Sequence, residues 1–106
     1  MSSLSTHVLD AATGIPAVGV VVDLSTLGGE PRGGGVTDAD GRLRLAEDLP
    51  PGDYRIRFAT RLWFEQQGRE TFFPEVLVGV AVAPDRPHLH VPLLLSPFAY
   101  STYRGS

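Results

Sequence analysis

The sequence contains no cysteine and no lysine, and no apolar run is long enough to cross a membrane. The absence of cysteine excludes disulfides, thiolate catalysis and cysteine-ligated metal sites. Any stability beyond that of the modest core of a 106-residue chain is therefore expected from packing or from oligomerisation. Residues 1–20 lack a basic start followed by a long apolar run, so we expect no secretory signal.

Positive charge is also scarce. All nine basic residues are arginines, and the formal net charge is -3 at pH 7. Because the sequence has no basic patch, it predicts no nucleic-acid partner, and without a long apolar segment it predicts no membrane partner. The final Arg-Gly-Ser differs from the peroxisomal Ser-Lys-Leu address, so we expect a cytoplasmic protein.

Glycine and proline, by contrast, are abundant. Twelve glycines and nine prolines are spread along the chain, which favours many short elements joined by turns. Residues 61–67 are the one plausible helix, ended by Gly68. Strands are predicted, mostly from alternation of apolar and polar residues, at 4–10, 42–45, 53–58, 72–82, 88–95 and 98–103. This pattern predicts an all-β sandwich of roughly seven or eight short strands.

Three less regular segments carry separate predictions. Residues 18–24 are a continuous β-branched run, which predicts a strand buried on both faces or at an interface. Residues 28–35 are predicted to be a glycine-rich connecting loop, since neither the lysine nor the helix start of a phosphate-binding loop follows. Residues 37–42 predict a tight Asp-Gly turn from which Arg42 begins the next strand. A calcium loop is excluded there, because Leu49 stands where its last glutamate would be.

The segment 86–106 holds most of the groups that could do chemistry. Chain ends are usually polar and frayed, whereas this end is apolar enough to be buried. If residues 88–95 form a strand, alternation places His88 and His90 on one face and Leu89, Val91 and Leu93 on the core face. The functional question is what the histidine face contacts.

The histidines allow a metal site as one hypothesis. His88 and His90, with His7 as a third ligand, would suit zinc. No carboxylate is obviously placed to orient these rings, although Asp10 and Asp85 lie nearby in the sequence. Solvated or core-edge histidines explain the same pattern more simply, so a metal site is not favoured.

A metal-free site is the other hypothesis. One imidazole would act as a general base on water, since histidine titrates near physiological pH. Arg42 and Arg104 would hold a planar, oxygen-rich substrate through paired hydrogen bonds. The simpler explanations are that His7 is an edge-strand residue and that Arg104 belongs to a charged tail. The residue pattern alone therefore predicts a β-sandwich and leaves its activity open.

Five segments of the sequence resemble a known family. They are Leu-Ser-Thr-His-Val-Leu-Asp at 4–10, Thr-Asp-Ala-Asp-Gly-Arg at 37–42, Gly-Arg-Glu-Thr-Phe-Phe-Pro-Glu at 68–75, His-Val-Pro-Leu-Leu-Leu-Ser-Pro at 90–97 and Tyr-Arg-Gly-Ser at 103–106. Together they resemble the transthyretin-related 5-hydroxyisourate hydrolases. The terminal tetrapeptide is the most specific segment, because the hydrolases end on it and the hormone-carrying transthyretins do not.

The resemblance implies that residues 1–106 are a single transthyretin-like hydrolase domain, a two-sheet β-sandwich of about eight strands with one short helix. It also implies a homotetramer whose active sites lie in a channel at a dimer–dimer interface. The implied reaction is hydrolysis of 5-hydroxyisourate to 2-oxo-4-hydroxy-4-carboxy-5-ureidoimidazoline in urate catabolism. The resemblance further implies that no cofactor and no metal is needed.

The resemblance also implies site residues. His7, Arg42 and His90 match the catalytic positions, and Ser106 is expected to orient water or substrate. One imidazole would take the proton from water while arginine stabilises the oxyanion, and which of His7 and His90 is the base stays open. His88 is expected to be a supporting or channel-mouth residue. The expected substrate-binding residues are Arg42, Tyr103, Arg104, Gly105 and Ser106.

Two other functions remain as alternatives. A non-catalytic transthyretin-like carrier of an aromatic ligand would have lost the histidines or the terminal tetrapeptide, and both are present. A structural sandwich domain of a larger assembly would tolerate extension of its C-terminus, whereas a hydrolase would lose activity on C-terminal tagging.

Overall fold

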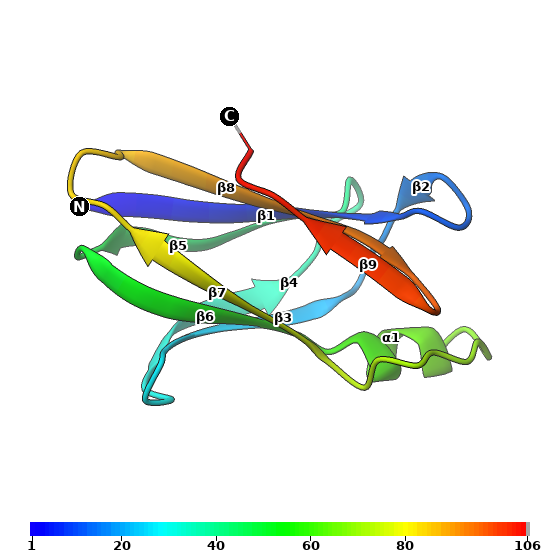
Figure 1. The fold of residues 1–106 in the computed structure, drawn as a ribbon. Helices are drawn as coiled ribbons and strands as arrows, with labels where there is room; N and C mark the ends of the chain where they lie inside the picture. Colours follow the sequence, from blue (N-terminus) through cyan, green and yellow to red (C-terminus); the bar gives the residue numbers. More distant parts are fainter. Residues whose placement is uncertain (106) are drawn as a thin grey trace.

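The computed structural model describes residues 1–105, in which nine strands and one helix form two facing sheets (Figure 1). One sheet has the order β2-β1-β8-β9, with β5 also paired to β1, and the other has the order β4-β3-β6-β7. The predicted two-sheet sandwich with one short helix is therefore confirmed. The elements are β1 (Ser2–Asp10), β2 (Ile15–Pro16), β3 (Val21–Thr26), β4 (Pro31–Val36), β5 (Arg42–Leu49), β6 (Gly52–Phe58), α1 (Thr60–Glu65), β7 (Val76–Val82), β8 (His88–Ser96) and β9 (Ala99–Thr102).

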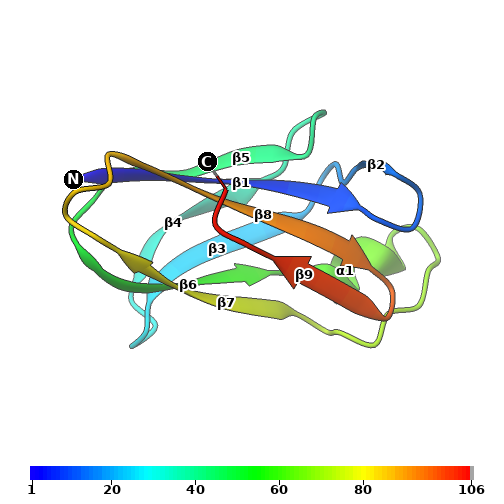
Figure 2. The ribbon, with the colours of Figure 1, turned by 45° about the horizontal axis from the view of Figure 1, so that its top comes forward.

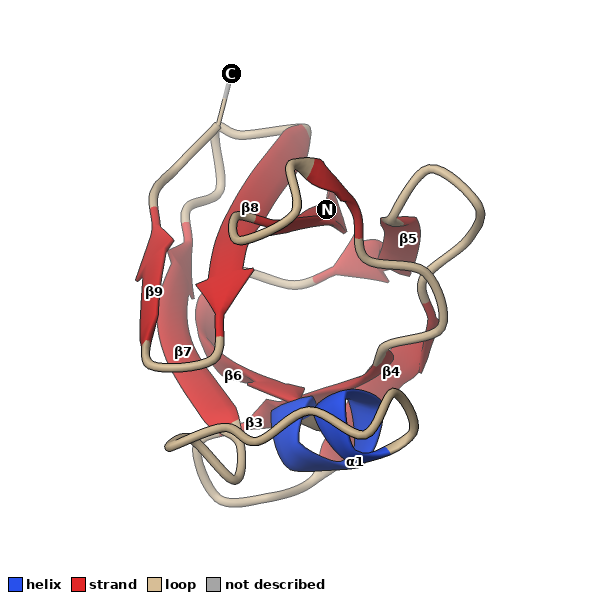
Figure 3. Cartoon of the chain, turned by 90° about the vertical axis from the view of Figure 1, so that its right-hand side faces the viewer, coloured by secondary structure: helices blue, strands red, loops and turns tan. Residues whose placement is uncertain are grey.

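The core lies between the sheets and is built by the alternation seen in the sequence. Every second residue of β1 is buried, so Leu4 and Val8 face the core while His7 faces outward. In β6 the same alternation buries Ile56 and Phe58. Figure 3 views the molecule from the end that carries α1, with the strands of the two sheets on opposite sides of the interior.

The pairing of β1 determines which side chains meet outside the core. β1 runs parallel to β8, with Ser3 opposite His88 and Ser5 opposite His90. On its other edge β1 runs antiparallel to β5, with His7 opposite Arg42. Figure 2 shows β1 between β5 and β8, with β9 beyond β8. Segments about 85 residues apart in the sequence therefore share one sheet face.

The prediction for residues 18–24 is wrong in its bounds and in its burial on both faces, while the alternative of an interface strand stays a prediction. Gly19 has a φ of 85°, which ends extended structure there, and β3 begins only at Val21. Within β3, Val22 is fully buried while Asp23 is exposed, so the strand has one core face and one outer face. The outward Asp23 carboxylate accepts a hydrogen bond from Arg57 at 3.1 Å.

The prediction of a glycine-rich loop at residues 28–35 is also wrong, because most of this segment is strand β4 paired to β3. The glycines allow β4 to lie against β5 of the opposite sheet. A Cβ placed on Gly33 would lie 2.1 Å from the carbonyl oxygen of Leu45. Here glycine permits a close backbone contact between sheets rather than a flexible connection.

We expect Gly33→Ala to lower the free energy of unfolding by about 1–3 kcal/mol, because the new methyl group would force backbone away from backbone. The measurement is a urea unfolding curve for both proteins. The matched control is Gly28→Ala, whose Cβ would meet only Thr26 Oγ1 at 3.8 Å. Equal midpoints for Gly33→Ala and the unchanged protein would contradict the close packing of β4 on β5.

The short helix is confirmed, and its contacts explain why the predicted strand 72–82 begins late. α1 is followed by Gly68 with a φ of 66°, as the sequence predicts. Residues 72–75 instead lie across the helix start, where the Thr60 hydroxyl donates to the Phe73 carbonyl at 2.7 Å and the Arg61 N–H donates to the Pro74 carbonyl at 3.1 Å. Within residues 1–105, no helix is long and apolar enough to cross a membrane.

Candidate active site

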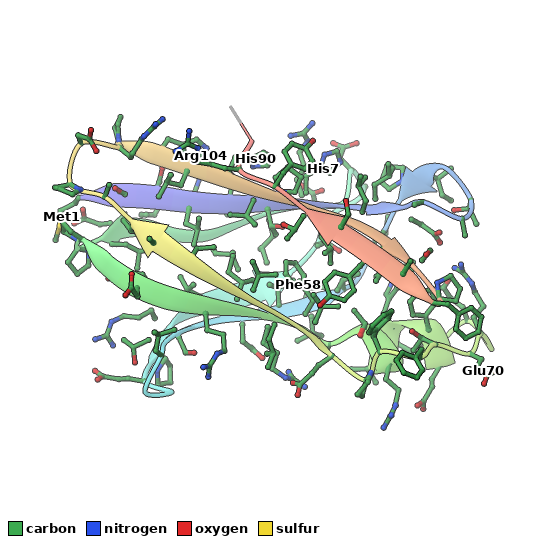
Figure 4. The ribbon with its side chains drawn as sticks, in the orientation of Figure 1. Met1, His7, Phe58, Glu70, His90 and Arg104 are labelled. Carbon is green, nitrogen blue, oxygen red and sulfur yellow. The ribbon has the colours of Figure 1, made fainter. Side chains whose placement is uncertain are left out.

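The outer face of the β5-β1-β8 sheet gathers the polar side chains that the sequence singles out. Alternation along β1 points Ser5 and His7 outward, and alternation along β8 does the same for His88 and His90. Arg42 joins them from the first position of β5. Figure 4 shows His7 and His90 on this outer side, whereas Phe58 lies between the sheets.

These side chains surround a mostly polar pocket of about 410 Å³. Two predicted catalytic residues, Arg42 and His90, line it together with His88. His7 is not part of the lining, yet its charge acts on both His90 and Asp38. The lining residues are Ser5, Thr6, Asp38, Arg42, Leu43, Arg44, His88 and His90.

Arg42 is held at the edge of the pocket by the turn that precedes it. The N–H groups of Asp40 and Arg42 each donate to Asp38 Oδ1 at 2.9 Å. Gly41 adopts a φ of 75°, which glycine permits without steric cost. Hydrogen bonds from the N–H groups of Arg42 and Asp40 are the main reason that the pKa of Asp38 is lowered. The predicted Asp-Gly turn is thus confirmed, and it orients the start of β5.

The end of the described chain returns to the histidine strand. The Gly105 N–H donates to the carbonyl oxygen of His90 at 2.8 Å. A Cβ on Gly105 would lie 2.9 Å from Cδ2 of the His90 ring, so only glycine fits without a shift. The tail is therefore packed directly on His90, although Ser106 lies outside the described residues.

Tyr103 and Arg104 precede Gly105 in the tail and line another pocket of the single chain. They line a second, largely apolar pocket of about 290 Å³ beside β7, where Val78 and Val80 form part of the wall. Arg104 lies on the same outer side of the molecule as His7 and His90 (Figure 4). The structure thus brings Gly105 against His90 and places Tyr103 and Arg104 at the second pocket.

Sequence reasoning missed the serines that contact the histidines. Ser3 Oγ lies 2.6 Å from His88 Nδ1, while Ser5 Oγ lies 3.3 Å from His88 Nε2 and 2.8 Å from His90 Nδ1. Ser3, Ser5 and His7 are every second residue of β1, so the sequence already shows that they share one strand face. Only the parallel register of β1 and β8 reveals that the serines meet His88 and His90.

The electrostatics of His90 favour its neutral form. Burial is the largest cause of its lowered pKa, followed by the positive charges of Arg42, His7 and His88. A neutral ring has one nitrogen free to accept a proton. His90 can therefore act as a base near neutral pH.

The zinc hypothesis finds no support in the geometry. Among residues 1–105, no three His, Cys, Asp or Glu side chains lie close enough to hold a metal ion. Asp10 does not orient the histidines, because its buried carboxylate accepts a hydrogen bond from Arg69 at 2.7 Å.

Comparison with known sequences identifies the family. The profile of the transthyretin family, described as HIUase/Transthyretin, matches residues 4–105. The chain belongs to the HIUase/Transthyretin family. The 5-hydroxyisourate hydrolase of Caulobacter vibrioides is 47% identical to it over an alignment of 115 residues, which covers 100% of each chain.

Solved structures of this family have the same fold. The 5-hydroxyisourate hydrolase of Klebsiella pneumoniae superimposes with a TM-score of 0.91 at 42% identity, covering 100% of this chain and 94% of that one. Sea bream transthyretin in complex with thyroxine superimposes with a TM-score of 0.88 at 34% identity, covering 96% of this chain and 93% of that one. Since both proteins share the sandwich, the fold does not separate the two functions, and the site must do so.

Proposed function

We propose that residues 1–106 act as one hydrolase domain that converts 5-hydroxyisourate to 2-oxo-4-hydroxy-4-carboxy-5-ureidoimidazoline in urate catabolism. The observation that carries the proposal is the meeting of His90 and Arg42 at one polar pocket on the outer sheet face, with His7 opposite Arg42 on the neighbouring strand. The relatives named as 5-hydroxyisourate hydrolases support the same substrate.

The proposed reaction begins when a neutral imidazole takes a proton from water. The water oxygen then attacks a ring carbonyl carbon of the substrate, and the carbonyl oxygen becomes negative. Collapse of this intermediate breaks the ring C–N bond, and the protonated imidazole returns its proton to the departing nitrogen. His90 suits the proton transfer, because its lowered pKa leaves it unprotonated near neutral pH.

Arginine and the tail would act on the substrate oxygens. The Arg42 guanidinium lines the pocket from a fixed turn, so it can hold a carbonyl oxygen and stabilise the oxyanion. Gly105 packs on His90 and would limit how deeply the substrate enters. Tyr103, Arg104 and Ser106 complete the proposed binding residues, with Ser106 orienting water or substrate.

We also propose that the working unit is a homotetramer whose active sites lie at a dimer–dimer interface. In a single chain the pocket opens on the outer sheet face, and His88 at its edge is exposed. A facing subunit would exclude bulk water, which strengthens the electrostatic stabilisation of a developing oxyanion.

The test of the proposed function is the decay of freshly generated 5-hydroxyisourate, followed by ultraviolet absorbance with and without the protein. We expect decay well above the spontaneous rate, and a C-terminal tag should reduce it while leaving the circular dichroism spectrum unchanged. If well-folded tetramer does not accelerate the decay, the hydrolase proposal fails. A carrier of an aromatic ligand would then be the better explanation.

We expect Gly105→Ala to lower kcat/KM for 5-hydroxyisourate by about 10-fold, a loss typical of a misplaced supporting group. The reason is steric, because the added Cβ would displace either the tail or the His90 ring. Gly28→Ala, far from the pocket, is the control and should keep full activity. Wild-type kinetics for Gly105→Ala would show that the tail does not need its close contact with His90.

A further inference from the structure

Four side chains form a continuous row of hydrogen-bonded groups on the outer face of β1 and β8. In order they are Ser3, His88, Ser5 and His90, and the three links between them measure 2.6, 3.3 and 2.8 Å. Ser3 Oγ also lies 3.4 Å from the carbonyl oxygen of Pro87, where the row ends. The parallel register, with Ser3 opposite His88 and Ser5 opposite His90, produces this alternation of hydroxyl and imidazole.

The Pro87 carbonyl gives the row a direction. A carbonyl oxygen only accepts, so the Ser3 hydroxyl donates to it, and Ser3 Oγ then accepts from His88 Nδ1–H. Neutral His88 has no proton on Nε2, which accepts from the Ser5 hydroxyl. Ser5 Oγ in turn accepts from Nδ1–H of His90. While His88 is neutral, the proton of His90 is therefore on Nδ1, and its Nε2 is left with a free lone pair.

We propose that Ser5 is a positioning residue that holds the His90 ring in its Nδ1–H tautomer, with Nε2 as the base that takes the proton from water. This inference rests on the proposed hydrolase function, and it assigns the base to His90 rather than to His7. His88 and Ser3 extend the row and set its direction. The hydrogen bond on one ring nitrogen determines the tautomer, as it does for other catalytic histidines.

The charges around His90 are consistent with a neutral ring whose tautomer matters. His90 faces His7 on β1, Arg42 and Arg44 on β5, His88 on its own strand, Asp38 in the turn before β5 and, on the same outer side, Arg104 of the tail. Together with burial, the positive groups lower the pKa of His90. The ring is thus deprotonated over the neutral range, where Ser5 can select between its two neutral forms.

The direct test is nitrogen-15 NMR of the ring nitrogens in the full-length protein labelled at histidine. The chain has three histidines, and the signal missing from His90→Asn identifies His90. At a pH where the rings are neutral, we expect His90 Nδ1 to carry the proton and Nε2 to have the shift of a bare nitrogen. In Ser5→Ala the Nε2–H form should increase. An Nε2–H tautomer in the unchanged protein would overturn the proposal.

Kinetics with 5-hydroxyisourate provide the second test. We expect Ser5→Ala to lower kcat by about 10- to 100-fold, the usual cost of losing a group that orients a functional histidine, with little change in KM. Ser5→Thr restores a hydroxyl and should recover most of the rate. Ser25→Ala, on β3 of the other sheet, is the matched control and should be unaffected. Equal kcat for Ser5→Ala and Ser25→Ala would overturn the proposal.

The two tests separate this inference from the proposed function. If NMR finds the predicted tautomer but the protein does not hydrolyse the substrate, Ser5 still positions His90 and the proposed reaction is wrong. If the protein hydrolyses the substrate but His90 has the opposite tautomer, the proposed reaction stands and Ser5 is not the positioning residue.

Discussion

His90→Asn is expected to lower kcat/KM for 5-hydroxyisourate by about 10²- to 10⁴-fold, the range for loss of a general base. The asparagine amide can still donate a hydrogen bond near Ser5, but it cannot accept a proton from water. The imidazole that it replaces lines the pocket with Arg42 and is kept neutral by burial and by positive neighbours. The measurement is the substrate decay followed by ultraviolet absorbance.

The matched control for this variant is His88→Asn, which removes an exposed imidazole from the same sheet face. It disturbs only the outer part of the serine–histidine row, so we expect a smaller loss of rate. Both variants should keep the melting temperature and the oligomeric state of the unchanged protein. An active His90→Asn protein would transfer the role of base to His7.

Asp10→Ala is expected to lower the free energy of unfolding by about 2–4 kcal/mol, because removing one partner of a buried ion pair leaves the other charge unpaired. The Asp10 side chain is only 4% exposed, and its Oδ2 accepts from Arg69 Nη1 at 2.7 Å. Its Oδ1 accepts from the N–H groups of Ala12 and Thr13 at 3.0 and 3.2 Å. One carboxylate thus connects the end of β1, the following turn and the segment after α1.

Arg69 strengthens this connection through the helix. Its guanidinium carbon lies 4.8 Å from the centre of the Phe64 ring and 5.8 Å from that of Trp63. Urea unfolding of Asp10→Ala, Arg69→Leu and the double variant measures the coupling, and the double variant should be more stable than the sum of the single losses predicts. Asp23→Ala is the control, since its pair with Arg57 is exposed and should contribute about 0–1 kcal/mol.

The same carboxylate predicts a pH dependence of stability. Burial alone would raise the pKa of Asp10, but the Arg69 hydrogen bond and charge and the N–H groups of Thr13 and Ala12 outweigh burial, so the pKa is lowered. The stabilisation is therefore present above the unfolded pKa of about 4 and is lost as the pH falls through the lower folded pKa. Asp10→Ala should abolish this part of the acid destabilisation. If the variant and the unchanged protein lost the same free energy of unfolding at low pH, the ion pair would be contradicted.

Much of the sandwich could be predicted from local pattern. Alternation in residues 4–10 and 53–58 predicts strands with one buried face, and the structure places Leu4 and Ile56 in the core accordingly. The turn before Arg42 and the end of the helix each need a backbone with positive φ, which residues other than glycine seldom adopt. Gly41 and Gly68 supply it. These features depend on neighbours within a few residues, which is why the sequence reveals them.

The errors fall where distant segments decide the conformation. Residues 28–35 have the composition of a loop, yet the approach of β5 makes the glycines of β4 a requirement of packing. The run 18–24 is mostly apolar, but Gly19 interrupts it before β3 begins. Asp23 faces outward, where it pairs with Arg57 of β6. The contact of β4 with β5 cannot be read from the residues of β4 themselves.

For the site, the order of residues is enough to show which side chains are available: the histidines, the arginine after the Asp-Gly turn and the glycine near position 105. How these side chains meet depends on the folded sheet, because hydrogen bonds such as that between Ser5 and His90 join residues 85 positions apart. A shift of one residue in the β1–β8 register would turn one set of these side chains to the core. The register is chosen by burial of the whole sheet, and local sequence carries no record of it.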